Sequence, residues 1–525
     1  MSTTQEFGKW RSRLWPVHTF ELKKVLPMLF LFFLILFNYQ ILRDTKDSLI
    51  VPASGAETIP FLKFWGTLPM AFIFMLVYAK LSNKLSKPAL FYSTVIPFIV
   101  FFGLFATTLY PMRDALHPHA FCDKMETILP SGLYGLVQVI RNWTFSLFYI
   151  MSELWGSMAL SLLFWGFAND ITRVSESKRF YNLFGLGANP ALIVAGPLIM
   201  YFSNNRAHVP AGVDAWQISL NYLMGMVVGA GVLIVGIYWW INRYVLTDKR
   251  FYDAGEVKKK KEKPKMSIGE SFKYLLRSRY LGSIALLVLC YGISVNVIEV
   301  IWKKQLGAQF SNHNDYSAFM GLFTLVTGVV STLTMLFVGG NVIRKLGWKF
   351  GALTTPVMML VTGAIFLALV LGGNVFGGVA AAMGTTTLMM AVVIGMGQNI
   401  LTKSCKYAMF DPTKEMAYIP LDQEQKVKGK AAIDVVGARL GKSGGSLILQ
   451  GLLIGFGGQL VAAIPYVAGT VILITVIWIY AARALSARFE KANAEKDAEI
   501  AAEEAQAKTA ELAQTKAASL ASAKN

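Results

Sequence analysis

Residues 220–241 read LNYLMGMVVGAGVLIVGIYWWI, and none of these side chains is charged. An α-helix rises about 1.5 Å per residue, so a run of this length can cross a hydrocarbon layer of about 30 Å. Segments 61–81, 90–109 and 462–482 are comparably long and apolar. Because lipid offers no hydrogen-bond partner to an open backbone, such runs have to form helices. The sequence therefore predicts an all-α integral membrane protein.

The composition of the chain agrees with this location. Of its 525 residues, 54% are hydrophobic and 15% are charged, whereas a soluble domain carries about 25% charged residues. The net charge of +19 would indicate nucleic acid binding in a soluble protein. Here most of the charge lies in alternate segments between the apolar runs, so we expect a lipid bilayer and no nucleic acid as partner.

Signatures of catalysis and of metal binding are missing from the sequence. Cys122, Cys290 and Cys405 form no CxxC pair, so neither a disulfide framework nor a zinc site is indicated. Residues 437–443 resemble a phosphate-binding loop, but the glycine spacing is one residue short and no strand precedes it. We expect no enzymatic activity, no catalytic residue, no metal site and no cofactor.

The apolar runs predict twelve transmembrane helices in two groups of six. The first group lies at 25–43, 61–81, 90–109, 142–167, 180–201 and 220–241. The second group lies at 280–301, 319–338, 350–371, 380–402, 431–454 and 459–482. This order, with a basic linker between the groups, is typical of a major-facilitator-like fold, in which two halves rock about a site at mid-membrane.

The distribution of basic residues predicts the orientation. With the N-terminus inside, roughly thirty lysines and arginines fall on the cytoplasmic side and about seven on the other. We expect five regions: an N-terminal segment (1–24), a six-helix half (25–242), a basic linker (243–279), a second six-helix half (280–483) and a tail (484–525). Both termini would be cytoplasmic, and the tail would be partly helical or flexible.

Polar residues inside the predicted spans are the candidates for function, because a charge costs about 2.5–3.5 kcal/mol at the centre of a lone helix. Asn142, Tyr149 and Glu153 share one face of the fourth span. Arg43 and Lys46 stand near the outer end of the first span. These faces are expected to meet protein or water instead of lipid.

The second half carries a similar set. Asn296, Glu299 and Lys303 are spaced i, i+3 and i+7 in the seventh span, and Arg439 and Lys442 are neighbours in the eleventh. Any one of these residues could equally well form a structural ion pair or a contact that holds the two halves together, instead of binding a solute. Glu299 and Lys303, spaced i and i+4, are a plausible local ion pair. As a set, the cations suit a polyanionic substrate. The residues alone indicate an importer or exchanger of an anionic solute.

Five long motifs carry a resemblance to a known family. They are NYQILRDTKDSLIV (38–51), SELWGS (152–157), FWGFAND (164–170), KEMAYIPLD (414–422) and KGKAAIDVVGARLGKSGG (428–445). These residues resemble the bacterial and plastid ATP/ADP translocase family, most of all its members from chlamydia-like bacteria. The resemblance runs from residue 22 to the end of the last span.

The resemblance implies exchange of external ATP for internal ADP, with phosphate as a further substrate in the bacterial members. It also implies a multi-pass protein of the bacterial inner (cytoplasmic) membrane, which we expect to be a monomer. The four charged positions associated with transport in the family match Lys46, Glu153, Glu299 and Lys442.

On this basis Lys46 and Lys442 are expected to hold the phosphates from opposite halves, while the two glutamates pair with cations in the empty site or contact the ribose or base. Tyr149 is a candidate to stack on adenine. The full set of candidate substrate contacts is Lys46, Glu153, Glu299, Lys442, Arg439, Arg43, Lys303, Asn296, Tyr149 and Asn142.

Two alternatives remain open. Relatives that import nucleotides with protons, or that exchange NAD for ADP, resemble the same pattern. A membrane scaffold without transport activity is a different class of function, but such a protein has no need for charges at mid-membrane.

Overall fold

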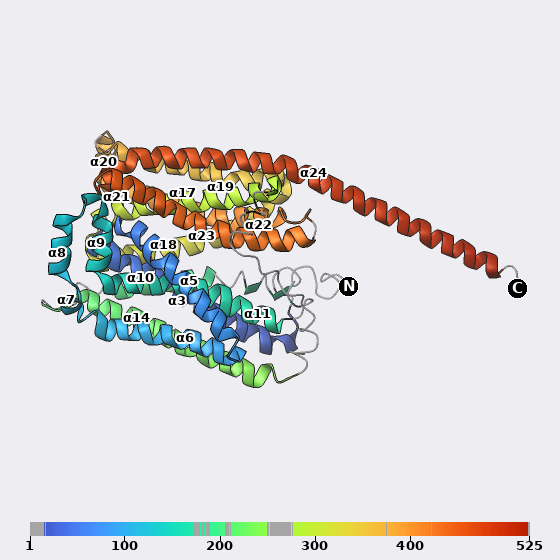
Figure 1. Cartoon of the computed structure of the whole chain (residues 1–525), viewed down its shortest axis with the longest axis horizontal. Helices are drawn as coiled ribbons and strands as arrows, with labels where there is room; N and C mark the ends of the chain where they lie inside the picture. Colours follow the sequence, from blue (N-terminus) through green and yellow to red (C-terminus); the bar gives the residue numbers. More distant parts are fainter. Residues whose placement is uncertain are drawn as a thin grey trace.

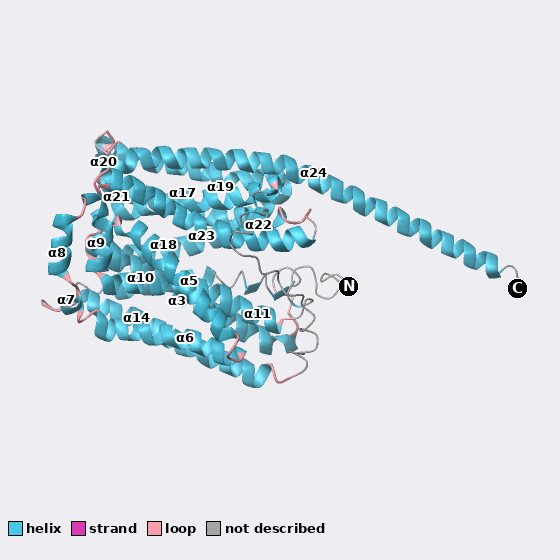
Figure 2. Ribbon diagram, viewed as in Figure 1, coloured by secondary structure: helices cyan, strands magenta, loops and turns pink. Residues whose placement is uncertain are grey.

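The computed structural model describes residues 17–172, 189–204, 212–248, 277–373, 375–421 and 423–522, together with short pieces between these ranges. Several side chains of the eleventh predicted span, those of 434–439 and 442 among them, lie outside this description, as do those near the end of the chain. Within the described residues every regular element is helical (Figure 2). The prediction of an all-α fold is confirmed.

The first half of the chain begins with one long helix and continues in shorter elements. Its elements are η1 (Thr19–Glu21), α3 (Leu22–Ser54), α4 (Thr58–Phe61), η2 (Leu62–Thr67), α5 (Leu68–Ser82), α6 (Lys87–Leu104), η3 (Phe105–Leu109), α7 (Arg113–Leu116), α8 (His119–Ile128), η4 (Ser131–Leu133), α9 (Tyr134–Arg141), α10 (Trp143–Trp155), η5 (Gly156–Phe164), α11 (Trp165–Ile171), α13 (Asn189–Ser203), α14 (Ala215–Trp240) and η7 (Ile241–Val245).

The second half has fewer and longer helices. Its elements are α17 (Arg279–Gln309), α18 (His313–Leu333), η8 (Thr334–Gly339), α19 (Gly340–Leu371), α20 (Gly377–Ala382), α21 (Thr387–Cys405), η9 (Lys406–Phe410), α22 (Asp411–Met416), α23 (Gln423–Gly455) and α24 (Leu460–Ser522). The last of these continues as a helix beyond the bundle (Figure 1).

Nine helices of the described residues are long and apolar enough to cross a membrane. One of them, His313–Leu371, covers two predicted spans, and Gly347 interrupts it with a left-handed φ of 84°. The shorter apolar helix Asn189–Ser203 overlaps the fifth predicted span, and the apolar stretch Ser443–Gly455 of α23 overlaps the eleventh. The number of twelve crossings therefore stays a prediction.

The first span extends further than its sequence indicated. We predicted its end at Arg43, where the charged residues begin, but α3 continues to Ser54. Asp44, Lys46 and Asp47 are all at least 97% buried. These charged side chains lie inside the bundle and contact other protein groups. They do not need to reach water, so the helix can continue past them.

Figure 1 places helices of the first half, such as α3, α6 and α14, along one side of the bundle and α17, α19 and α24 along the other. The two sets meet where α13 packs on α18. A Cβ atom built on Gly321 would lie 2.8 Å from the backbone oxygen of Gly196, so only glycine permits this approach. Polar contacts extend the same interface, including a 2.8 Å hydrogen bond from Ser203 to Ser317.

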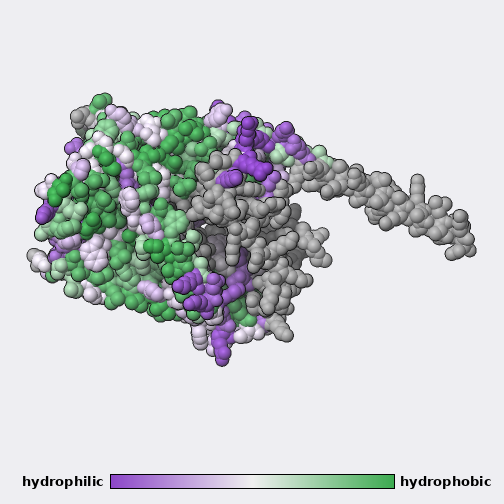
Figure 3. Space-filling model, viewed as in Figure 1, coloured by the Kyte–Doolittle hydropathy of each residue, from purple (hydrophilic) through white to green (hydrophobic). Residues whose placement is uncertain are grey.

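The outer surface of the bundle is apolar. In α5 no residue is buried, and Ile73, Leu76 and Val77 are between 47% and 67% exposed. Hydrophobic residues cover much of the face seen in Figure 3, with hydrophilic residues gathered toward the end nearer the tail. Such a surface would be unfavourable in water, and it suits contact with lipid.

Candidate functional site

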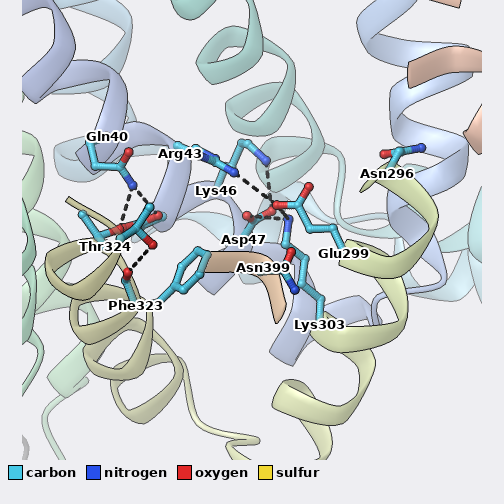
Figure 4. A network of polar contacts seen from close by, with 12 residues as sticks. Gln40, Arg43, Lys46, Asp47, Asn296, Glu299, Lys303, Phe323, Thr324 and Asn399 are labelled. Atoms are coloured by element: carbon cyan, nitrogen blue, oxygen red, sulfur yellow. Dashed lines mark hydrogen bonds and ion pairs between the residues drawn. The ribbon is translucent and has the colours of Figure 1, made fainter. Parts of the chain in front are cut away.

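The buried charges of α3 form the centre of a polar network between the two halves (Figure 4). Asp47 is completely buried, and its two carboxylate oxygens bind two lysines. Lys46 of the same helix lies 2.9 Å from Oδ1, and Lys303 of α17 lies 2.8 Å from Oδ2. One carboxylate thus joins a cation from each half.

Glu299 is the second carboxylate of this network. Its Oε1 lies 3.2 Å from Arg43 Nη2 on α3 and 3.4 Å from Lys303 Nζ one helical turn along α17. Figure 4 shows Glu299 and Asp47 directed toward the same group of cations. Charge-assisted contacts of this kind offset the cost of burying each group, provided that every member stays paired.

Lys46 also reaches the fourth predicted span. Its ammonium lies 3.2 Å from Glu153 Oε1 and 3.8 Å from the centre of the Tyr149 ring, both on α10. Glu153 is 23% exposed, whereas Lys46 is 3% exposed. The glutamate is therefore the member of this pair that an entering solute can reach most easily.

Two further groups of contacts flank the network. On one side Thr324 of α18 donates a 2.6 Å hydrogen bond to Asp44. Gln40 donates to Thr324 at 2.7 Å and to Asp44 at 3.0 Å. On the other side Lys63 of η2 donates to the Asn296 side-chain oxygen, and Asn296 donates to Ser446 of α23 at 3.1 Å.

These side chains surround a cavity of about 250 Å³. The lining residues are Tyr39, Arg43, Lys46, Lys63, Glu153, Tyr291, Gly292, Val295, Asn296, Glu299, Lys303, Lys403, Lys406 and Tyr407. Pockets for ligands of drug size measure about 300–1,000 Å³, so a nucleotide would require the cavity to widen. Six of the lining residues are basic and two are acidic, which makes the cavity suited to an anion.

Comparison with known proteins decides the family. A sequence profile of the TLC ATP/ADP transporter family matches residues 1–489. This chain belongs to that family.

Individual members are similar over most of their length. This TLC family member is 60% identical over 505 residues to the ADP,ATP carrier protein 1 of Chlamydia trachomatis serovar D, a match covering 95% of this chain and 96% of the relative. It is 50% identical to the chloroplastic ADP,ATP carrier protein 1 of Arabidopsis thaliana, over 93% of this chain and 77% of the relative. The predicted resemblance to chlamydial and plastid members is confirmed.

A solved structure also aligns with this TLC transporter. The crystal structure of a bacterial homologue of the iron transporter ferroportin, in its inward-facing state, gives a TM-score of 0.49 at 16% identity. The alignment covers 89% of this chain and all of the other.

The fold of this TLC transporter brings most of the candidate residues together. Arg43, Lys46, Glu153, Asn296, Glu299 and Lys303 all line the cavity. Tyr149 is fully buried beneath Lys46. The side chains of Arg439 and Lys442 lie outside the described residues, although their backbone belongs to α23.

Asn142 lies apart from this cavity. It donates hydrogen bonds to Ser54 Oγ at 2.8 Å and to Gln138 Oε1 at 3.3 Å, near the end of α3. It shares a sequence face with Glu153, but a different backbone conformation at Asn142, with φ −105° and ψ 46°, precedes α10. The helical spacing that grouped the two residues does not extend to this position.

Sequence reasoning missed several cavity residues of this TLC transporter, namely Lys63, Lys403 and Lys406, as well as Asp47 behind them. A signal was present for two of these lysines. Asn399, Lys403 and Lys406 are spaced i, i+4 and i+7, which places them on one helical face. Both lysines follow the predicted end of the tenth span at residue 402, where a lysine ordinarily belongs to the next loop.

Proposed function

We propose that this chain is an antiporter that exchanges ATP for ADP across a membrane. The observation that carries the proposal is the buried network in which Asp47 and Glu299 pair with cations from both halves of the chain. Membership of the TLC ATP/ADP transporter family supports it, as do relatives named ADP,ATP carrier proteins.

The charges of the cavity explain why exchange would be coupled. In this structure carboxylates hold Arg43, Lys46 and Lys303. A polyphosphate would compete with those carboxylates for the same cations. After one nucleotide leaves, the carboxylates and cations would pair again, and these ion pairs join the two halves. The two six-helix groups would therefore reorient most easily while a nucleotide is bound.

The remaining features of the proposal follow the family resemblance. ATP would enter from outside and ADP would leave, together with phosphate, through the inner membrane of a bacterium. Lys442 would act from the second half, with Arg439 as a helper. Tyr149 lies beneath Lys46 and does not line the cavity in this structure, so it would contact the base only after Lys46 moves aside. The chain would work as a monomer with both termini in the cytoplasm, and it would leave the nucleotides chemically unchanged.

Counter-exchange in proteoliposomes tests the proposal. Vesicles loaded with ADP should take up labelled ATP, and empty vesicles should take up almost none. Uptake that ignores internal ADP but follows a proton gradient would instead indicate symport. Uptake of NAD in place of ATP would indicate the NAD/ADP exchanger.

A scaffold without transport activity gives a different result in detergent. A transporter of nucleotides should be stabilised against heat by ATP and by ADP, because a ligand that binds only the folded state raises stability with its concentration over Kd. A protein that neither exchanges nucleotides nor shows this stabilisation would contradict the proposal.

A further inference from the structure

Lys403 is a buried lysine that none of the interactions described above uses. It stands near the end of α21, its side chain is 7% exposed, and it lines the cavity. Its ammonium lies 4.4 Å from the centre of the Phe323 ring on α18. The aromatic face supports the cation on one side.

Among the described side chains, Lys403 differs from the other cations of the cavity. Arg43, Lys46, Lys303 and Lys406 each contact a carboxylate, and Lys63 donates to the Asn296 amide. The ammonium of Lys403 has no hydrogen-bond partner and forms no ion pair within the described part of the chain. A buried ammonium without a partner is unfavourable, so its retention in a solute cavity points to an anion that arrives from outside.

The carboxylates nearest to Lys403 are already engaged. Glu299 and Asp44 act on it at longer range, as do the cations Arg43 and Lys303. Glu299 is held by Arg43 and Lys303, while Asp44 accepts hydrogen bonds from Thr324 and Gln40. Neither carboxylate forms an ion pair with Lys403 among the described side chains, so both act on its ammonium only at longer range.

We propose that Lys403 binds the phosphate chain of the nucleotide, an inference that rests on the proposed exchange of ATP and ADP. A lysine holds a phosphate oxygen as a point charge with three rotatable donors. A phosphate that reaches Lys403 breaks no existing ion pair, whereas one that reaches Lys46 or Lys303 has to displace a carboxylate. The phosphate chain therefore binds Lys403 first. Lys46 and Lys303 then release their carboxylates and bind the phosphates in turn.

The variant Lys403→Gln tests this inference. Homoexchange of labelled ADP for ADP and of ATP for ATP should be measured in proteoliposomes without added phosphate. We expect the KM for both nucleotides to rise about tenfold or more, the effect of losing one hydrogen bond to a charged group. Lys403→Arg should restore most of the affinity, because it keeps the charge. Lys124→Gln, which removes an exposed lysine of α8, should behave as the unchanged protein does.

A second measurement separates binding from folding. The heat stabilisation of the purified protein by ATP and by inorganic pyrophosphate should require about tenfold higher ligand concentrations in Lys403→Gln, while its melting temperature without ligand should not fall below that of the unchanged protein. If the glutamine variant does not fold, Lys403→Met removes the same charge without adding a buried amide.

The outcomes are distinguishable. Unchanged KM values in the glutamine variant would overturn the role of Lys403, and so would a defect that occurs only when inorganic phosphate is the counter-substrate. A lower ligand-free melting temperature with unchanged KM would assign Lys403 a structural role through Phe323 and would also overturn it. If the unchanged protein exchanges no ATP or ADP, the proposed function itself fails, and this inference fails with it.

Discussion

Lys303 Nζ lies 2.8 Å from Asp47 Oδ2, and neither side chain is more than 2% exposed. Lys303 belongs to α17 and Asp47 to α3, so a buried ion pair connects the two halves of the chain. The other oxygen of the same carboxylate binds Lys46 at 2.9 Å. Asp47 therefore compensates two ammonium groups that would otherwise repel each other inside the bundle.

Replacing Asp47 by Asn should destabilise the protein by about 3 kcal/mol, at the lower end of the range for breaking a buried ion pair. The loss of stability stays in this range because each lysine retains a second ion pair, Lys46 with Glu153 and Lys303 with Glu299. Thermal melting in detergent measures the change. The double variant with Lys303→Met should lose less than the sum of the single variants, since the two residues interact. Asp114→Asn is the control, because Asp114 is 88% exposed.

Replacing Glu153 by Gln should tighten nucleotide binding and slow exchange. Glu153 competes with a phosphate for Lys46, and Asp47 still compensates Lys46 after the change. We expect the KM for ATP to fall by about tenfold, the effect of removing one charge-assisted contact, with a lower maximal rate because release is slower. Initial rates of proteoliposome exchange at varied ATP provide both quantities. A higher KM would show that Glu153 contacts the substrate favourably.

Replacing Gly321 by Ala should weaken the packing of α18 on α13. The added Cβ would lie 2.8 Å from the backbone oxygen of Gly196, and backbone cannot move aside as a flexible side chain can. The matched control is Gly225→Ala on α14, where nothing lies within 4 Å of the new Cβ. Alanine gains about 0.5–1 kcal/mol over glycine within a helix, so the control should melt at the same or a higher temperature. Equal melting of both variants would contradict the close approach.

Stability should fall in acid through His117, which lies between the spans. Burial lowers the pKa of His117 to about 4, and its Nε2 lies 2.7 Å from Thr144 Oγ1. The unfolded chain binds the proton with the usual pKa of about 6.5. The stabilisation is therefore complete above that pH and is lost as the pH falls toward 4. His117→Gln should reduce the difference in melting temperature between pH 7 and pH 5. His119→Gln, at an exposed position, should reduce this difference less, because the charge of His119 lowers the pKa of His117 less than burial does.

Replacing Lys442 by Gln should abolish uptake of ATP while the protein remains folded. The prediction rests on the motif at 428–445, whose resemblance to the family implies a role in transport for this lysine. Lys491→Gln, which removes a lysine that is 79% exposed, is the control. Normal uptake by the Lys442 variant, measured in the same vesicles as the control, would remove this residue from the proposed site.

Much of the candidate site could be found from the sequence, because a charge within an apolar run is visible without a structure. Glu153 and Glu299 are recognisable on that ground, and Lys46, three residues beyond the predicted end of the first span, is indicated by its helical spacing from Arg43 and by the family motif. Lys403 carries no such indication, because it stands at the end of an apolar run, where a lysine ordinarily reaches water. Helical spacing shows which residues of one helix share a face. It does not show which end of that helix is buried by neighbouring helices.

The long apolar runs alone determined that this protein is a helical membrane protein, because a run of about 20 apolar residues crosses the lipid as a helix and satisfies its backbone hydrogen bonds within itself. The tertiary structure alone decided which charges are partners. Asp47 and Lys303 are 256 residues apart in the chain and become neighbours only when α3 packs against α17. The energy of an ion pair depends on the distance between its charges and on their burial, and both are properties of packing between helices that local sequence does not contain.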